Sequence, residues 1–265
     1  TMLAHAQLDA YVHDHYDDVQ FGGMLADTPV YPATAKPNDV FAARQLDQFS
    51  NQNLNEAFVY GHYDHEVLTY IKNHDIDYDL QPGDNEILAK MHADFISFSY
   101  YRTTTINADK IPAGTAPNRY LNYAMEDNRF LDSNEWDWTI DPLGFRTLIT
   151  DLYNRYQVPV FPIENGVGIS EHWDGQHMIE DDLRIKYHAE HIKAMKDAMF
   201  IDGAKVLGYL GWGLIDIPSS HADIEKRYGV VYVNRSNHDL KDMKRVPKKS
   251  FYWLQALLEK NGDEL

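Results

Sequence analysis

The chain has 265 residues, of which 44% are hydrophobic and 25% charged, which is typical of a globular protein and excludes a disordered or fibrous one. Lys and Arg number 24 against 41 Asp and Glu, and the resulting charge of -17 disfavours a nucleic acid or an anionic membrane surface as partner. The chain has no cysteine, so disulfides, cysteine-ligated metals and a thiol nucleophile are excluded. No apolar run reaches the roughly 18 residues of a membrane span, and no signal-peptide pattern is found, so a soluble cytoplasmic protein is expected.

Helices and strands are predicted to alternate along the first half of the chain. A helix at residues 3–15 has an apolar side formed by Leu3, Leu8, Tyr11 and Val12, and a strand follows at residues 20–26. Helices are predicted after Pro37 and at residues 64–73 and 84–92, and they lead to an aromatic strand at residues 95–101. Residues 103–141 show no clear period, and we expect them to form a long loop.

The second half continues this alternation. A helix at residues 142–156 is followed by a strand at 158–163, and a helix at 181–200 is followed by a strand at 206–212. A hairpin arm at 228–233 and a helix at 248–260 come last. This order predicts a parallel sheet with crossover helices. A complete (β/α)8 barrel takes about 250 residues. The chain has that length, but it supplies only four barrel-type strands.

Functional side chains follow three of the predicted strands. Tyr101 ends the second strand, Glu164 follows the third and Trp212 ends the fourth. In an α/β barrel the carboxyl ends of the strands face the active site, so these side chains are expected at one mouth. A carboxylate above an aromatic floor suits a sugar, because pyranose C–H faces stack on Trp and the hydroxyls need buried partners. The alternative is that Glu164 is an ordinary salt-bridge partner or helix cap.

Residues 162–166, Pro-Ile-Glu-Asn-Gly, resemble the nucleophile motif of the retaining β-glycosidases of glycoside hydrolase family 1. Further segments resemble the family in order and spacing, at residues 28–34, 94–101, 138–146, 226–229 and 248–253. The likeness covers nearly the whole chain, and every segment matches the C-terminal half of the family.

The resemblance implies an α/β fold that is the C-terminal half of a (β/α)8 TIM barrel, about strands 5–8 with their helices. Residues 1–265 would form a single partial barrel domain, with the N-terminal half absent. Glu164 would be the nucleophile, and Tyr101 would hydrogen-bond to it and help to keep it ionised. Trp212 would line the site of the glycone.

A retaining glycosidase needs a second carboxylate, about 5 Å from the first, as general acid/base. In the family this residue is the Glu of an Asn-Glu-Pro-type motif that ends strand four. Asn-Glu pairs occur here only at Glu56, Glu86 and Glu135, and none of them follows an apolar strand. We therefore expect that the acid/base is absent from this chain.

The loop after Trp212 indicates the subfamily. Generic members carry a Glu-Trp pair there, whose Glu binds glycone hydroxyls, whereas this chain has Ser219 and Ser220. Lys226 adds a cation, and Ser219 and Tyr228 add neutral donors, which together suit a phosphate dianion. The spacing resembles the 6-phospho-β-glycosidases, and Ser220, where the galactosidase branch carries Trp, favours phosphoglucosides. The alternative is a surface loop with an ordinary Lys-Arg pair.

The resemblance implies retaining hydrolysis of 6-phospho-β-glucosides in the intact family enzyme, without a cofactor. The isolated chain is expected to be inactive; the alternatives are a non-catalytic truncated remnant or one chain of a split enzyme that binds phosphosugar. No metal is expected, because the histidines within residues 13–15, 62–65 and 188–191 fit surface positions or positions beside a site. Half a barrel leaves strand edges and an inner face uncovered, so self-association or pairing with a missing N-terminal half is expected.

Overall fold

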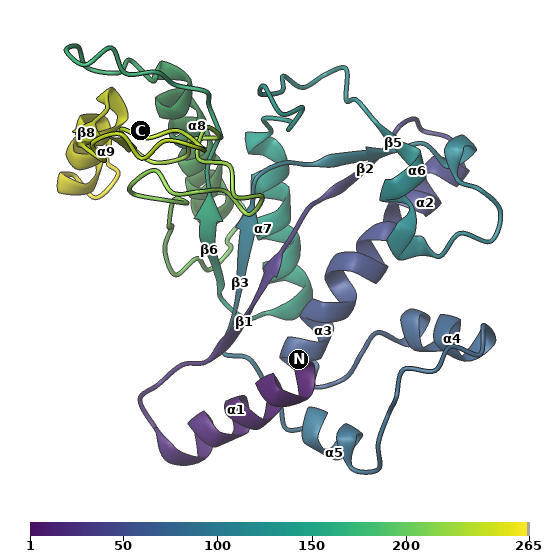
Figure 1. Ribbon diagram of the computed structural model, residues 1–265. Coiled ribbons are helices and arrows are strands. Elements are labelled where there is room, and N and C mark those ends of the chain that lie inside the picture. The colour runs from purple at the N-terminus through teal and green to yellow at the C-terminus, as the bar shows by residue number, and fades with distance from the viewer. Residues whose placement is uncertain (264–265) are drawn as a thin grey trace.

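Parallel strands form the central sheet of the computed structural model, which describes residues 1–263 (Figure 1). They are β1 (Gly22–Ala26), β3 (Phe95–Tyr100) and β6 (Val160–Asn165), in the spatial order β1-β3-β6. Each lies at a predicted strand, with its ends shifted by one or two residues. Helices separate these strands along the chain, so the α/β class predicted from the alternation is confirmed.

The fourth predicted strand, at residues 206–212, is not a regular strand. The segment runs beside β6, and the N–H groups of Leu207 and Trp212 donate to β6 carbonyls over 3.0 and 2.8 Å. Only Val206 makes a β-bridge to that strand. Gly208 and Gly211 offer no side chains for cross-strand packing, which weakens strand pairing. The segment therefore occupies the place of the fourth strand without its regular ladder.

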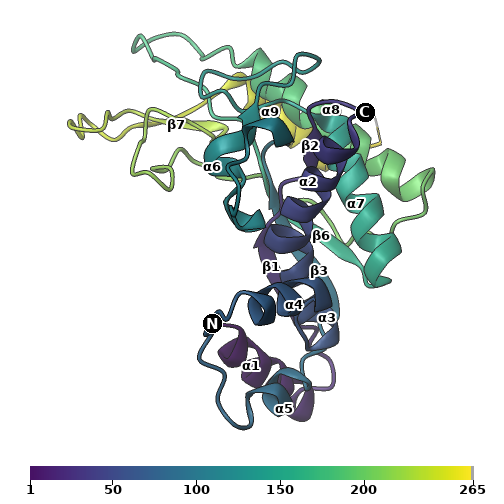
Figure 2. The same ribbon diagram turned by 90° about the vertical axis from the view of Figure 1, so that its right-hand side faces the viewer.

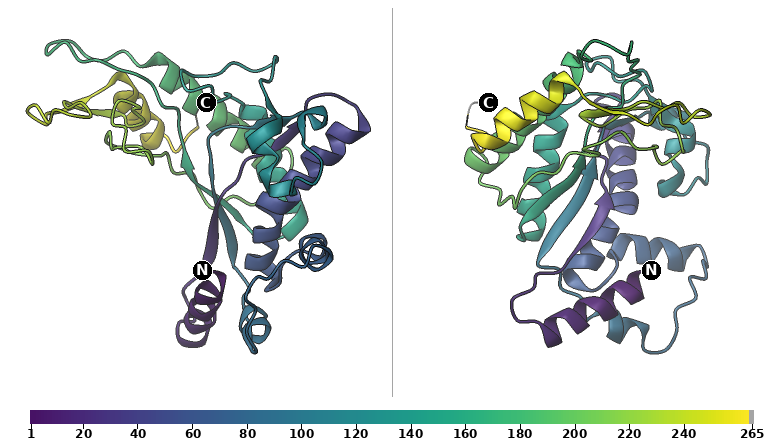
Figure 3. Two further views of the ribbon diagram at one scale, coloured as in Figure 1. Left: turned by 45° about the vertical axis from the view of Figure 1, so that its right-hand side comes forward. Right: turned by 60° about the vertical axis from the view of Figure 1, so that its left-hand side comes forward.

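The helices largely follow the predictions. Those near the start of the strands are α1 (Met2–His15), α4 (His65–Asn73) and α5 (Asp84–Leu88), which is shorter than expected (Figure 2). The helix predicted after Pro37 is longer than expected, because α2 (Pro37–Asp47) continues through a π-helical turn (Gln48–Gln52) into α3 (Asn53–Tyr60). The later helices are α7 (Pro142–Tyr156), α8 (Asp182–Phe200) and α9 (Lys249–Glu259), the last of which packs along α8 (Figure 3).

Residues 103–141 contain more structure than the predicted loop. They hold β4 (Thr104–Ile106), α6 (Leu121–Ala124), β5 (Met125–Glu126) and two short 3-10 turns, and β4 pairs with β2 (Val30–Pro32) and β5 in a second sheet. Ile106, Tyr120 and Ala124 are buried against Ala42 and Leu46 of α2. These apolar residues are irregularly spaced, so the sequence shows no period although the segment packs.

The predicted hairpin arm is present. It consists of β7 (Val231–Val233), which pairs antiparallel with β8 (Arg245–Pro247). Among residues 1–263, no helix is both long enough and apolar enough to cross a membrane.

The main core lies on the outer face of the central sheet. Alternate residues of β3, namely Ile96, Phe98 and Tyr100, point to this face and are almost fully buried. They pack in one cluster with α7 and α8, including Phe145 and Ile192. Burial of these side chains supplies the main hydrophobic stabilisation of the sheet–helix contact, at roughly 25 cal/mol for each Å² of apolar surface.

The inner face of the sheet is less well covered. Phe95 and Phe161 contact each other edge to face, with ring centres 6.3 Å apart, but both are only partly buried. On α1 the predicted apolar side is wrong in part: Leu8 and Tyr11 are 49% and 50% exposed, while Ala6 is fully buried. In residues 1–263 nothing covers the side of this helix that carries Leu8 and Tyr11. The apolar residues of the helix therefore do not coincide with its buried face.

Candidate active site

Glu164 and Tyr101 meet at the carboxyl end of the central sheet. Glu164 is the next-to-last residue of β6, and Tyr101 directly follows β3. The Tyr101 hydroxyl donates a hydrogen bond to Glu164 Oε2 over 2.9 Å. Burial and the negative charge of Glu164 raise the pKa of Tyr101 far above its ordinary value, so the phenol remains a proton donor to the carboxylate.

Asn165 fixes the end of β6 beside Glu164. Its side chain is fully buried and donates to the Tyr100 carbonyl over 2.8 Å and to the Tyr187 hydroxyl over 3.1 Å. Its Oδ1 accepts from the Tyr209 hydroxyl over 2.7 Å. Bonds from β3, α8 and the segment after α8 thus converge on one amide, which holds the backbone that carries Glu164.

Trp138 joins this pair to a cationic group. The Lys226 Nζ lies 3.5 Å from the centre of the Trp138 ring, and Lys226 is 7% exposed. The Tyr101 ring lies 5.7 Å from Trp138 and 5.9 Å from Tyr228, centre to centre. Four predicted site residues, at positions 101, 164, 226 and 228, therefore fall in one cluster built around Trp138.

The cationic side of the cluster holds a second positive charge. The Arg102 guanidinium also lies over Trp138, 5.1 Å from the ring centre. Burial and the nearby Arg102 charge lower the pKa of Lys226, while Asp223 opposes this shift. Neither cation takes part in an ion pair within residues 1–263. Two neighbouring cations without an ion-pair partner form a cationic wall of the cluster that is suited to an anion.

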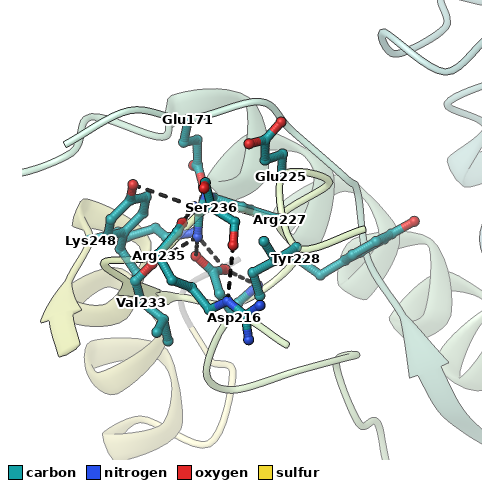
Figure 4. A network of polar contacts seen from close by, with 12 residues as sticks. Glu171, Asp216, Glu225, Arg227, Tyr228, Val233, Arg235, Ser236 and Lys248 are labelled. Atoms are coloured by element: carbon teal, nitrogen blue, oxygen red, sulfur yellow. Dashed lines mark hydrogen bonds and ion pairs between the residues drawn. The ribbon is translucent and has the colours of Figure 1, made fainter. Parts of the chain in front are cut away.

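A buried ionic network holds the loop that carries Lys226 and Tyr228 (Figure 4). Arg184 of α8 donates to the carbonyl of Arg227 over 2.9 Å and to that of Tyr228 over 3.1 Å. The Arg227 side chain pairs with Asp216 at 3.0 Å. These bonds fix the backbone of the loop and the Arg227 side chain. The neighbouring side chains of Lys226 and Tyr228 remain free to face the cluster.

The network is electrically balanced. Lys248 pairs with Glu171 at 2.5 Å and with Asp216 at 3.0 Å. Arg184 pairs with Glu171 at 2.8 Å and with Asp181 at 2.9 Å. With Arg227, three cations thus face three carboxylates, so each buried charge has a partner, as its desolvation requires.

The family model described as "Glycosyl hydrolase family 1" matches residues 1–263. The chain belongs to this family. It is 36% identical over 254 residues to the aryl-phospho-beta-D-glucosidase BglH of Bacillus subtilis, covering 96% of this chain and 53% of that relative. It is 38% identical over 270 residues to a 6-phospho-beta-glucosidase of Dickeya chrysanthemi, covering 100% of this chain and 56% of the relative.

The fold agrees with this membership. The family 1 β-glucosidase of Thermotoga maritima superposes with a TM-score of 0.83 at 24% identity, covering 100% of this chain and 56% of that structure. The chain thus spans about half the length of the relatives it matches, and its fold is that of a partial α/β TIM barrel.

Trp212 and Ser219 are less closely tied to the cluster of this family 1 chain. The Trp212 backbone is bonded to the end of β6, and its side chain is partly buried. The Ser219 hydroxyl accepts from the N–H groups of His221 and Asp223, each over 3.4 Å, within its own turn. No hydrogen bond links Ser219 to Lys226 in the described part of the chain. The predicted substrate-binding roles of Trp212 and Ser219 stay predictions.

The Asn-Glu pairs lie in other settings. Glu56 on α3 pairs with Arg155 at 2.7 Å, and Glu86 is on the short helix α5. Glu135 is exposed and accepts from the Ser170 N–H over 3.0 Å. Within residues 1–263 none of the three is hydrogen-bonded to Glu164. The expectation that this chain lacks the acid/base stays a prediction.

Sequence reasoning missed the roles of Trp138, Trp136 and Arg102. Trp136 lies 5.1 Å from the Lys226 Nζ, so two Trp rings face this ammonium. Trp138 lies in a segment that resembles the family, but the region around it was expected to be a long loop and no role was assigned to this side chain. Arg102 directly follows Tyr101, so its place beside a predicted site residue is the signal that could have found it.

Proposed function

We propose that this chain carries the nucleophile and the phosphate-binding side of a retaining 6-phospho-β-glucosidase. The observation that carries the proposal is one cluster in which Tyr101, hydrogen-bonded to Glu164, and the Lys226 ammonium both lie against Trp138. The curated relatives named for phospho-β-glucosidases support the substrate class.

The proposed reaction has two steps. The Glu164 carboxylate attacks the anomeric carbon, the bond to the aglycone oxygen breaks, and that oxygen takes a proton from the general acid. Water then attacks the glycosyl ester, gives a proton to the same residue now acting as base, and releases the 6-phosphosugar and free Glu164. Tyr101 donates to Glu164 and orients its carboxylate between turnovers.

The 6-phosphate would lie at the cationic wall. Lys226 supplies a charged donor, Tyr228 and Ser219 supply hydroxyl donors, and Arg102 adds a second charge beside Lys226. Trp212 would contact the glycone. We also infer that the protein works in the cytoplasm without a cofactor.

The general acid/base would come from outside this chain. Glu56 and Glu135 are bonded elsewhere, which favours a second function: a phosphosugar-binding chain that does not catalyse hydrolysis alone, or one chain of a split enzyme. Residues 1–265 would then act as a single partial barrel domain in all of these cases.

Two substrates separate these functions. The chain alone should not hydrolyse 6-phosphocellobiose at an enzyme-like rate, because general acid/base assistance contributes about 10²–10⁴-fold. A 2,4-dinitrophenyl 6-phospho-β-glucoside needs no protonation of its leaving group, so it should add one 6-phosphoglucosyl group to Glu164, visible by intact mass. Glu164→Gln is the control and should remain unlabelled.

Rapid turnover of 6-phosphocellobiose by the chain would disprove the prediction that this chain lacks the acid/base. Failure to label Glu164, together with binding of the phosphosugar, would favour the non-catalytic function. Labelling by the unphosphorylated glucoside at the same rate would argue against a phosphate site.

A further inference from the structure

A second cluster of polar groups lies far from Glu164, where the strands of the central sheet begin. Asp9 and His13 are one turn apart on α1, and His92 precedes β3. One ligand atom from each residue lies within 4.8 Å of the others. Figure 1 shows α1 at the end of the molecule where β1 and β3 begin, whereas Glu164 is near the opposite end of β6.

The Asp9 carboxylate lacks a full set of partners. Its side chain is 0% exposed, and Oδ2 accepts from the His92 N–H over 2.9 Å. Oδ1 is buried and has no hydrogen-bond partner in the described part of the chain. A buried carboxyl oxygen without a hydrogen-bond partner costs free energy, and a cation bound here would supply that partner.

The spacing from each histidine to Asp9 is close to that between neighbouring ligand atoms of a tetrahedral zinc site. His13 Nδ1 lies 3.5 Å from Asp9 Oδ1, and His92 Nδ1 lies 3.5 Å from Asp9 Oδ2. Zinc bonds of about 2.0–2.1 Å place neighbouring ligand atoms roughly 3.3–3.4 Å apart. Small side-chain shifts would therefore bring the three groups around one ion.

A second carboxylate supports this geometry. His13 Nε2 lies 3.0 Å from Asp94 Oδ2, which also accepts from the Phe21 N–H over 2.7 Å. Histidine ligands of zinc commonly donate their other ring N–H to a carboxylate, which orients the ring. Without a metal, His13 Nδ1 and His92 Nδ1 donate to the carbonyls of Asp9 and Lys90, over 3.0 and 2.8 Å, and zinc would replace these two protons.

We infer that Asp9, His13 and His92 form a structural zinc site, with Asp94 orienting His13. The ion would tie α1 to the segment that enters β3. Its place at the amino ends of the strands favours a role in stability and not in the reaction, which belongs to the carboxyl ends. The inference is independent of the proposed phosphoglucosidase function.

The test is a zinc titration of the full chain after treatment with a chelator, followed by calorimetry and by a thermal melt. We expect one ion per chain and a higher melting temperature, and Co²⁺ in place of zinc should give the visible absorption of a tetrahedral site. His92→Ala removes one of the three ligands, so zinc affinity should fall by more than the about 10- to 100-fold that follows loss of an outer-shell partner. His92 is 63% exposed, so this variant should fold, which circular dichroism without zinc verifies.

His15→Ala is the matched control. His15 lies on the same helix and makes the same bond to the carbonyl four residues earlier, at 2.8 Å from Tyr11, but it belongs to no cluster of ligands in residues 1–263. This variant should bind zinc like the parent. Failure of the parent to bind zinc, unchanged binding in His92→Ala, or equal losses in both variants would overturn the inference.

Discussion

Lys226 is unusual for a lysine because its ammonium is buried against aromatic rings and beside another cation. The nearest groups are Trp138 at 3.5 Å and Trp136 at 5.1 Å, measured from Nζ to the ring centres. Aromatic faces stabilise a cation only in part, so the site retains attraction for an anion. Among the groups proposed to bind the phosphate, we therefore expect Lys226 to contribute most to the preference for a phosphorylated sugar.

Lys226→Ala should abolish the preference of the chain for glucose 6-phosphate over glucose. A charged hydrogen bond is worth about 1.5–3 kcal/mol, so the affinity for the phosphosugar should fall roughly 10- to 100-fold in calorimetry. Lys244→Ala is the control, because the Lys244 Nζ lies 4.8 Å from the Trp173 ring, a similar contact that is not part of the cluster. Equal binding of both sugars by the parent would contradict a phosphate site and would favour the alternative that Lys226 belongs to an ordinary surface loop.

Asp27 shows how one buried carboxyl affects stability. It follows β1, is 1% exposed, and accepts from Asn55 Nδ2 over 3.0 Å. Its Oδ1 and the Asn55 Oδ1 are both buried without partners in the described residues. Burial, partly offset by Asn55, raises the pKa of Asp27 from 3.8 to about 7.

Asp27→Asn should therefore stabilise the protein at pH 8. Between pH 4 and 7 the folded state keeps a proton that the unfolded state loses, so the free energy of unfolding falls as pH rises through this window. An amide supplies an N–H to Asn55 and carries no charge, which should raise the free energy of unfolding by at most about 4 kcal/mol at pH 8, and much less near pH 4.

Urea unfolding at both pH values measures this change. Asp18→Asn, at an exposed turn, is the control and should show no such pH-dependent gain. A gain of the same size at pH 4 and pH 8 would show that Asp27 does not hold a proton.

At the scale of elements, α8, α9 and the loop between them are joined by the ionic network of Figure 4. Arg184 extends from α8 and Lys248 lies directly before α9. Both contact Glu171, on the segment after β6. The packing of α9 on α8 is thus combined with buried ion pairs that hold the loop of Lys226 and Tyr228.

Lys248→Met should lower the free energy of unfolding by about 3–5 kcal/mol, because two cations would then face three buried carboxylates and leave one negative charge uncompensated. Lys249→Met is the matched control on the next residue. Lys249 pairs with Glu180 and Asp182 at the surface, and its loss should have little effect. Similar losses in both variants, measured by urea unfolding, would show that the network does not carry this energy.

At the scale of the whole molecule, three paired strands and one irregular segment cannot close a barrel. Met24 on β1 is 40% exposed, and β1 has no strand partner on its outer edge in residues 1–263. Unpaired edges and exposed apolar faces favour association. We therefore propose that a second copy, or a separate N-terminal half, covers this side.

Light scattering at tens of micromolar should show a dimer or a larger assembly. Met24→Lys should shift the population toward the monomer, because it places a charge on the open face. Phe200→Lys is the control, since Phe200 is 76% exposed and is the last residue of α8, outside the central sheet. A monodisperse parent monomer with a cooperative melt would contradict the proposal.

The sequence by itself determined the α/β class, most helix positions and the family, because these depend on local periodicity and on contiguous motifs. It also selected Tyr101 and Glu164, since each ends a strand and parallel strands bring such ends together. Tertiary structure alone decided the rest. Trp138 and Arg102 reach Lys226 from segments far away in sequence, and the buried face of α1 depends on which neighbours are present, so no local pattern could encode either one.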